Sequence, residues 1–126
     1  MNSDAVVVWQ PRSHNLAFVG ATHQGSNLVA TLEIWNATSG KLVQQYVGVC
    51  IGPVVWSPGG TYLACAGYVG KGAENAVMIM NAVSGKRIYV YAGHRLPVSV
   101  IAWSPNGEYI VSGEGNTQMV AKVWIA

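Results

Sequence analysis

Short runs of apolar residues, each followed by a turn, recur along the whole chain. The runs are four to seven residues long, rich in Val, Ile, Trp and Tyr, and separated by Gly, Pro, Asn and Ser. No stretch of about 11 residues or more places apolar side chains at the i, i+3, i+4, i+7 spacing of an amphipathic helix. The pattern therefore predicts strands. We expect eleven strands, at residues 5–9, 16–21, 29–35, 42–47, 53–57, 62–67, 76–80, 87–91, 98–103, 109–113 and 119–125.

Three tryptophans, Trp9, Trp56 and Trp103, stand 47 residues apart and mark an internal repeat. Each tryptophan closes an apolar run, and a turn with a proline two positions later follows it. Gly-Gly and Asn-Gly pairs in two of these turns supply the positive φ that tight hairpins need. The sequence therefore predicts a single all-β domain over residues 1–126, built from three tandem units of antiparallel strands. The units cover residues 5–47, 53–91 and 98–126.

The repeated units resemble the WD-repeat (WD40) β-propeller family. The residues that carry the resemblance are Val-x-Trp-Ser-Pro-x-Gly at 54–60 and its counterpart at 101–107, Ile34-Trp35-Asn36, Thr38-Ser39-Gly40-Lys41 and Gly93-His94. The resemblance implies that each unit is a blade whose strands, called a to d in order, form one sheet. It also implies that large side chains on strands a and c pack between blades. The expected blade anchors are Trp9, Trp35, Trp56, Met80, Trp103 and Trp124.

The polar positions depart from the family pattern. Asn36, Asn81 and Ile125 stand where the family usually has an aspartate after strand c. His94 occupies the family's structural histidine position, so the resemblance implies that it caps a blade. The family often pairs this histidine with an aspartate between strands b and c, but these connections contain none. We therefore expect the buried polar network of the family to be absent or rewired.

The number of blades raises the question of how the propeller closes. The last unit ends after its third strand, so we expect that blade to lack its outer strand. Three blades do not form a ring, since propellers typically have about four to eight. Only 10% of the residues are charged, against about a quarter in soluble domains, which fits apolar sheet faces covered by association. We expect closure by copies of the chain, as a dimer with six blades or a trimer with nine, or by a different chain. Dimers are the commoner symmetry.

Composition excludes several other classes of protein. The longest charge-free stretch, residues 42–70, contains glutamines, prolines and a Gly-Gly pair, whereas a membrane helix needs about 20 predominantly apolar residues. The N-terminal residues 1–4 carry an acid and no basic segment, unlike a secretory signal. We therefore expect a cytoplasmic protein that does not bind membranes. The net charge of +2 comes from scattered basic residues, which argues against nucleic-acid binding.

Candidate chemistry is sparse. His14, His23 and His94 follow no metal-ligand spacing, and there is no Cys-x-x-Cys pair. Cys50 and Cys65 lie in apolar stretches and are expected to be free, buried, small hydrophobic residues. Acidic residues Glu74 and Glu114 fall in or beside connections between strands b and c, and nothing in the sequence sets their separation. We therefore predict no catalytic residues, no metal site and no cofactor.

The connections between strands b and c differ in length among the units, as expected on the binding face of a repeat protein. We predict a protein-interaction scaffold without enzymatic activity, whose partners include copies of itself. The alternative is a structural repeat fragment or one part of a split propeller, with solvated loops and no ligand of its own. The candidate contact residues on the predicted loop face are His23, Gln24, Tyr68, Lys71, Glu74, His94, Arg95 and Gln118.

Overall fold

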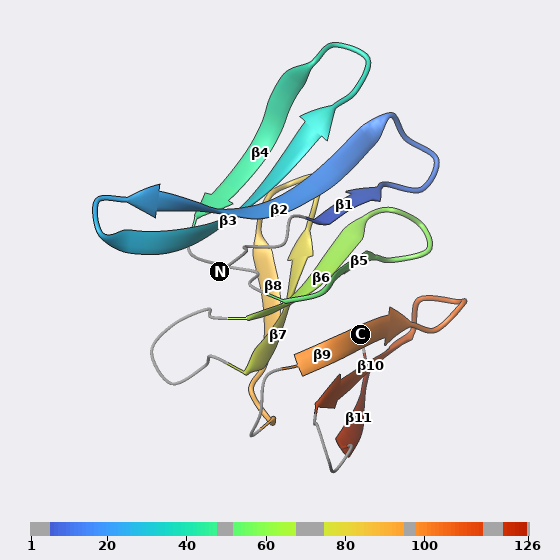
Figure 1. Ribbon diagram of the computed structural model, residues 1–126. Coiled ribbons are helices and arrows are strands. Elements are labelled where there is room, and N and C mark those ends of the chain that lie inside the picture. Colours follow the sequence, from blue (N-terminus) through green and yellow to red (C-terminus); the bar gives the residue numbers. More distant parts are fainter. Residues whose placement is uncertain (1–5, 48–51, 68–74, 95–97, 115–119, 126) are drawn as a thin grey trace.

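The chain folds into three antiparallel β-sheets that follow one another in sequence order (Figure 1). The computed structural model describes residues 6–47, 52–67, 75–94, 98–114 and 120–125. Within these residues the fold is all-β and contains no helix. The strands are β1 (Val6–Trp9), β2 (Asn15–Gln24), β3 (Asn27–Asn36), β4 (Lys41–Val47), β5 (Val54–Trp56), β6 (Tyr62–Gly67), β7 (Ala76–Asn81), β8 (Arg87–Tyr91), β9 (Val98–Trp103), β10 (Tyr109–Glu114) and β11 (Val120–Ile125).

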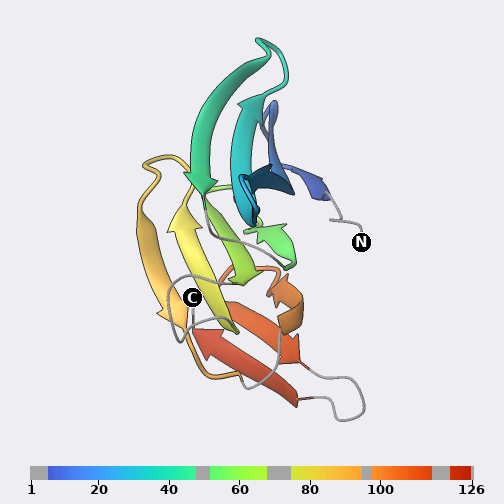
Figure 2. The same ribbon diagram turned by 60° about the vertical axis from the view of Figure 1, so that its left-hand side comes forward.

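Each sheet is a meander of sequential strands. The first sheet has the order β1-β2-β3-β4, the second β5-β6-β7-β8 and the third β9-β10-β11. All three are unclosed, and the second lies between the other two (Figure 2). The expected all-β class and partial propeller architecture are confirmed.

The turns explain why asparagine serves where the family usually has aspartate. The Asn36 side-chain oxygen accepts hydrogen bonds from the backbone N–H groups of Thr38 at 2.9 Å and Ser39 at 3.0 Å. Asn81 repeats this arrangement in the second sheet. Four residues later, Gly40 and Gly85 adopt positive φ and donate to the Asn backbone carbonyls. A neutral amide oxygen is a sufficient acceptor here, so the substitution preserves the turn.

The hairpin of β2 and β3 is longer than expected. We predicted a loop at residues 22–28, but the strands stay paired as far as Gln24 and Asn27. A tight turn at Gly25 and Ser26 then joins them, with Gly25 at φ 66°. Glycine reaches this φ without steric cost, so the two strands can pair to their ends. His23 and Gln24 are therefore strand residues, and their placement in a loop was wrong.

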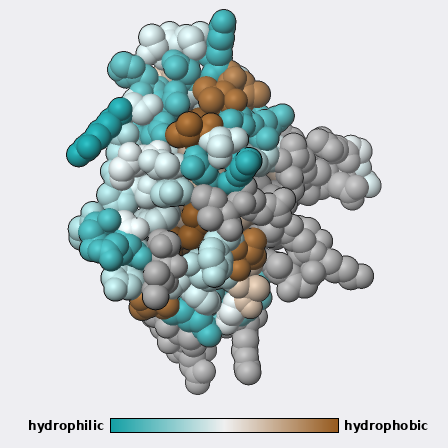
Figure 3. All heavy atoms as spheres, turned by 180° about the vertical axis from the view of Figure 1, so that it is seen from behind, coloured by the Kyte–Doolittle hydropathy of each residue, from teal (hydrophilic) through white to brown (hydrophobic). Residues whose placement is uncertain are grey.

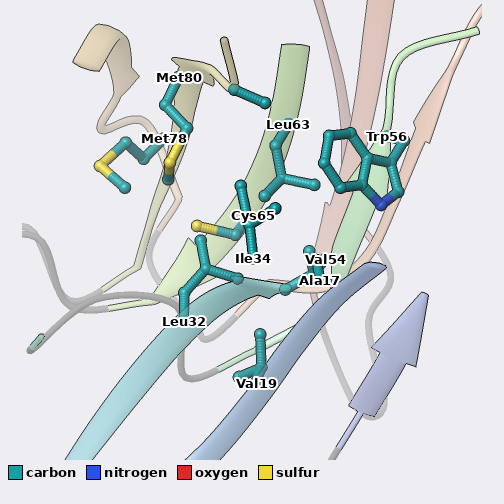
Figure 4. Close-up of a cluster of buried hydrophobic side chains, with 11 residues drawn as sticks. Ala17, Val19, Leu32, Ile34, Val54, Trp56, Leu63, Cys65, Met78 and Met80 are labelled. Carbon is teal, nitrogen blue, oxygen red and sulfur yellow. The ribbon is translucent and has the colours of Figure 1, made fainter. Parts of the chain in front are cut away.

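Two apolar clusters hold the three sheets together. Figure 4 shows Trp56, Leu63 and Cys65 of the second sheet converging with Leu32 and Ile34 of the first. A second cluster joins the other face of the second sheet to the third. It comprises Ala64, Ala66, Val77, Ile79, Tyr91, Val98, Ile101 and Ile110. The second sheet is thus buried on both faces, which explains the near-continuous apolar sequence of β6 and β7.

The state of the cysteines differs from the expectation. Cys65 is buried, with 1% of its surface exposed, but it is disulfide-bonded rather than free. The one other cysteine in the sequence, Cys50, lies outside the described residues. Apolar surroundings alone did not distinguish a bonded cysteine from a free one, because both are favoured in a core.

Truncation of Trp56 tests whether the joint between sheets carries the stability of the fold. Trp56 is only 9% exposed, so Trp56→Ala is expected to lower the free energy of unfolding by about 3–5 kcal/mol. Val83→Ala, in an exposed turn, is the control and should change it by about 0.5 kcal/mol or less. Urea denaturation measures both. A loss below about 1 kcal/mol for Trp56→Ala would contradict the packing role.

Candidate functional site

A chain of three buried polar side chains and one partly buried indole crosses the third sheet. His94 precedes β9, Ser112 and Glu114 lie on β10, and Trp124 lies on β11. The His94 ring places Nδ1 2.5 Å from Glu114 Oε1 and Nε2 2.6 Å from Ser112 Oγ. The Trp124 indole N–H donates to the same Ser112 oxygen at 2.8 Å. The network therefore ties the segment before β9 to both β10 and β11.

Donor and acceptor capacities assign the proton positions. Because Ser112 Oγ already accepts the Trp124 N–H, its own hydrogen can be donated to His94 Nε2. The opposite nitrogen, Nδ1, then carries a hydrogen and donates it to the Glu114 carboxylate. The side chains of His94 and Glu114 are 0% and 5% exposed, so these bonds offset the cost of removing polar groups from water.

Glu114 supplies a carboxylate to His94 in place of the aspartate that the connections between strands b and c lack. The connections between strands b and c contain no aspartate, as the sequence indicated. The buried network is nevertheless present in the third sheet, where a glutamate bonds the histidine. Ser112 and Glu114 are two residues apart, so they share one face of β10. A register shift in the pairing of β9 with β10 falls at Gly113 and Glu114, and such irregularities re-aim side chains. The serine–glutamate spacing was the signal that sequence analysis missed.

Among the residues that the structure describes, the equivalent positions of Ser112 and Trp124 in the second sheet are apolar. In the second sheet Cys65 matches Ser112 in register and Met80 matches Trp124, and both are buried in the apolar cluster. Replacing all members of a polar network by apolar groups avoids unsatisfied donors. In the first sheet the Trp35 N–H instead donates to Glu33 at 2.9 Å. The network is therefore a property of the third sheet.

The Ser112–His94–Glu114 order resembles the bonding pattern of a hydrolase triad. A nucleophile must reach a substrate, however, and Ser112 is 0% exposed. Its oxygen also accepts the Trp124 N–H, which occupies one of its lone pairs. The arrangement therefore stabilises the sheet, in keeping with the capping role that the sequence implied for His94. The described residues also contain no cluster of three His, Cys, Asp or Glu side chains that could hold a metal ion.

The predicted contact residues are only partly placed. His23 and Gln24 end β2, and the buried ring of His94 offers no surface to a partner. Tyr68, Lys71, Glu74, Arg95 and Gln118 lie outside the described residues. The loop face as a contact surface therefore stays a prediction for the remaining residues. Within the described parts of the chain, no helix is long and apolar enough to cross a membrane.

The predicted anchors behave in three ways. Trp56 and Trp103 each donate their indole N–H to the preceding sheet, to Val8 O at 3.2 Å and Val55 O at 3.3 Å. Trp124 stacks on Tyr91 of the second sheet with ring centroids 4.3 Å apart. Trp9 differs from the expectation because it is 62% exposed. The side of the first sheet that bears Trp9 faces away from the second sheet, so among the described residues no blade packs on it.

Replacement of Ser112 tests the buried network. Ser112→Ala leaves the Trp124 N–H and His94 Nε2 without their shared partner. We expect it to lower the free energy of unfolding by about 1–3 kcal/mol, the cost of unsatisfied buried groups. Ser99→Ala is the matched control, since the longer Ser99 bond to Gly113 O, at 3.4 Å, is only partly buried. Equal losses for the two variants, measured by urea denaturation, would show that the network contributes nothing.

Comparison with known proteins finds relatives that match most of this chain. The B-type cell cycle switch protein ccs52B of Medicago truncatula is 27% identical over 112 residues, which is 87% of this chain and 21% of that protein. The WD repeat-containing protein srw1 of Schizosaccharomyces pombe is 28% identical over 109 residues, 85% of this chain and 18% of that protein. The chain thus spans about a fifth of the length of these relatives.

A family model also matches part of the chain. Residues 85–124 match the "WD domain, G-beta repeat" family. The match covers β8, β9, β10 and β11 as far as Trp124, and it includes every residue of the buried network. The two preceding sheets repeat the strand order and the Trp register of this segment. The third sheet therefore matches the WD-repeat family, the chain as a whole is similar to WD-repeat proteins, and its three sheets are blades of a partial β-propeller.

Proposed function

We propose that this chain is a non-catalytic protein-interaction scaffold whose blades complete a propeller by association. WD-repeat domains in general mediate contacts between proteins, which supports the first part. One relative is named a cell cycle switch protein, and a regulatory role of that kind is a natural setting for a scaffold. The low net charge of +2 favours protein partners over nucleic acid.

The absence of catalysis is supported by the chemistry of the buried network. Its serine, histidine and carboxylate are committed to one another and to Trp124. A substrate has no access to Ser112, which is fully buried. The described residues that most resemble an active site are thus used to hold a blade together.

Association is supported by the exposed ends of the blade stack. Trp9 is 62% exposed on the first blade, and Val123 is 66% exposed on the third. These two exposed side chains are the main support for association. Val7, on the same side of β1 as Trp9, is 54% exposed, and Val111, which pairs with Val123, is 38% exposed. Exposed apolar side chains gathered on one face favour an interface. Elsewhere, as in the view from behind, hydrophobic residues form separate patches among polar ones (Figure 3). Two copies would provide six blades and three copies nine, and dimers are the commoner symmetry.

The cytoplasmic location stays a proposal, which the location of a tagged chain in cells would test.

The mass of the purified chain in solution tests association. Sedimentation equilibrium at micromolar concentration should give two or three times the chain mass of 13.4 kDa, because association covers the exposed ends. A mass of two copies corresponds to six blades. A stable monomer over this concentration range would contradict the proposal.

Capture of partners tests the loop face. The chain is used as bait beside a Lys71→Glu and Arg95→Glu double variant, which reverses charge on the predicted face. Lys41→Glu and Lys86→Glu, at the opposite turns after strand c, form the matched control. We expect a protein partner to be lost with the first pair and kept with the second. Recovery of the chain alone in every case would instead support a structural array whose sole partner is itself.

A further inference from the structure

Each blade has two different faces, and the same pair of faces meets at both internal joints. The tryptophan face carries the strand-a tryptophan, with Leu63 and Met80 beside Trp56 in the second blade. The acceptor face lies on the opposite side. In the first blade it is formed by Val8, Ala17 and Ile34, which pair side by side across the strands. These two faces make the first apolar cluster.

The second joint repeats the first with equivalent residues. The tryptophan face of the third blade carries Trp103, Ile110 and Trp124. It packs on an acceptor face formed by Val55, Ala64 and Ile79 of the second blade. Both joints therefore run in one direction along the chain, from a tryptophan face back to the acceptor face of the preceding blade.

One directed hydrogen bond marks each joint. The Trp56 indole N–H donates to Val8 O at 3.2 Å, and the Trp103 N–H donates to Val55 O at 3.3 Å. In each case the acceptor is the residue just before the tryptophan of the preceding blade. The equivalent acceptor on the third blade is the carbonyl of Ala102, which precedes Trp103.

Two faces remain without a partner among the described residues, and they are of opposite kinds. The first blade presents a tryptophan face, with Trp9 62% and Val7 54% exposed. The third presents an acceptor face whose Ala102, Val111 and Val123 repeat the cross-strand pairing of the internal acceptor faces. Val111 and Val123 are 38% and 66% exposed. The two faces lie at opposite ends of the stack, so one copy of this stack does not join its own ends (Figure 1).

A tyrosine makes the third blade a good match for Trp9. At the second joint, Trp103 stacks on Tyr62 of the preceding blade, with ring centroids 6.5 Å apart and planes at 21°. Tyr109 holds the same position in the third blade. Its backbone N–H bonds the hydroxyl of the preceding Ser104 at 3.0 Å, just as Tyr62 bonds Ser57. Tyr109 is 44% exposed and so presents an aromatic surface for another tryptophan.

We propose that the tryptophan face of the first blade docks on the acceptor face of the third blade of a second copy. The Trp9 indole N–H donates to the Ala102 carbonyl of the other copy, and its ring stacks on Tyr109. This inference rests on the proposed association and specifies its interface as head-to-tail. Two such joints related by a two-fold axis close a ring of six blades. The reason for a second copy is that both unpartnered faces repeat the chemistry by which this chain already joins its own blades.

Complementation between two variants, each altered on one of the two faces, tests the proposed joint between copies. Trp9→Arg places a charge on the tryptophan face, and Val123→Arg places one on the acceptor face. Both positions are exposed, so we expect the blades to stay folded. Each variant alone should associate at least tenfold more weakly than the unchanged chain in sedimentation experiments. A tagged Trp9→Arg chain should nevertheless capture an untagged Val123→Arg chain, because that pair retains one intact joint. Val83→Arg, in an exposed turn, is the control and should associate normally.

Each alternative has its own outcome. A monomeric unchanged chain overturns both the proposed association and this joint. An associating chain that tolerates both substitutions leaves association standing and overturns the joint. Loss with Trp9→Arg alone, without capture by Val123→Arg, indicates a symmetric Trp9 contact and also overturns it.

A milder substitution covers the case in which Trp9→Arg fails to fold. Circular dichroism on each variant reports whether its sheets remain. Trp9→Phe keeps an aromatic ring but removes the N–H donor, so it should weaken association by about 3- to 10-fold, as expected for one hydrogen bond. An unchanged affinity for Trp9→Phe would overturn the bond to Ala102.

Discussion

The packing of a strand-a tryptophan on the preceding blade is the interaction on which the rest of this structure depends. Trp56 and Trp103 combine a large apolar contact with an indole N–H that donates to a specific backbone carbonyl. The apolar area drives the sheets together, and the hydrogen bond sets their register and direction. A sheet of three or four short strands with an apolar face gains stability when that face is removed from water. Blade stacking therefore supplies the burial that each sheet needs.

The third blade adds a second means of stabilisation. Its buried network links three separate segments, and each member satisfies another. The second blade uses Cys65 and Met80 at the matching positions and stays apolar. Both solutions obey the same constraint, that a buried polar group must have a partner. Glu114 bonds His94 in place of the family's usual aspartate, and its side chain starts from β10 itself.

The direction of the joints links fold to function. Each internal joint buries one tryptophan face and one acceptor face. A stack of any length therefore has an exposed tryptophan face at one end and an exposed acceptor face at the other. Here those ends carry exposed Trp9 and Tyr109. A stack built this way leaves two complementary apolar faces exposed among the described residues, as a consequence of its repeat.

The sequence by itself determined the strands, their order and the repeat, because alternation and turn chemistry act over a few residues. The eleven predicted strands are all present, with errors only at their ends, such as the longer hairpin closed at Gly25. Tertiary structure decided which faces meet. The exposure of Trp9, the pairing of His94 with Glu114 and the bonded state of Cys65 depend on side chains far apart in the chain. Local pattern carries no information on those distances, and only the packed blades fix them.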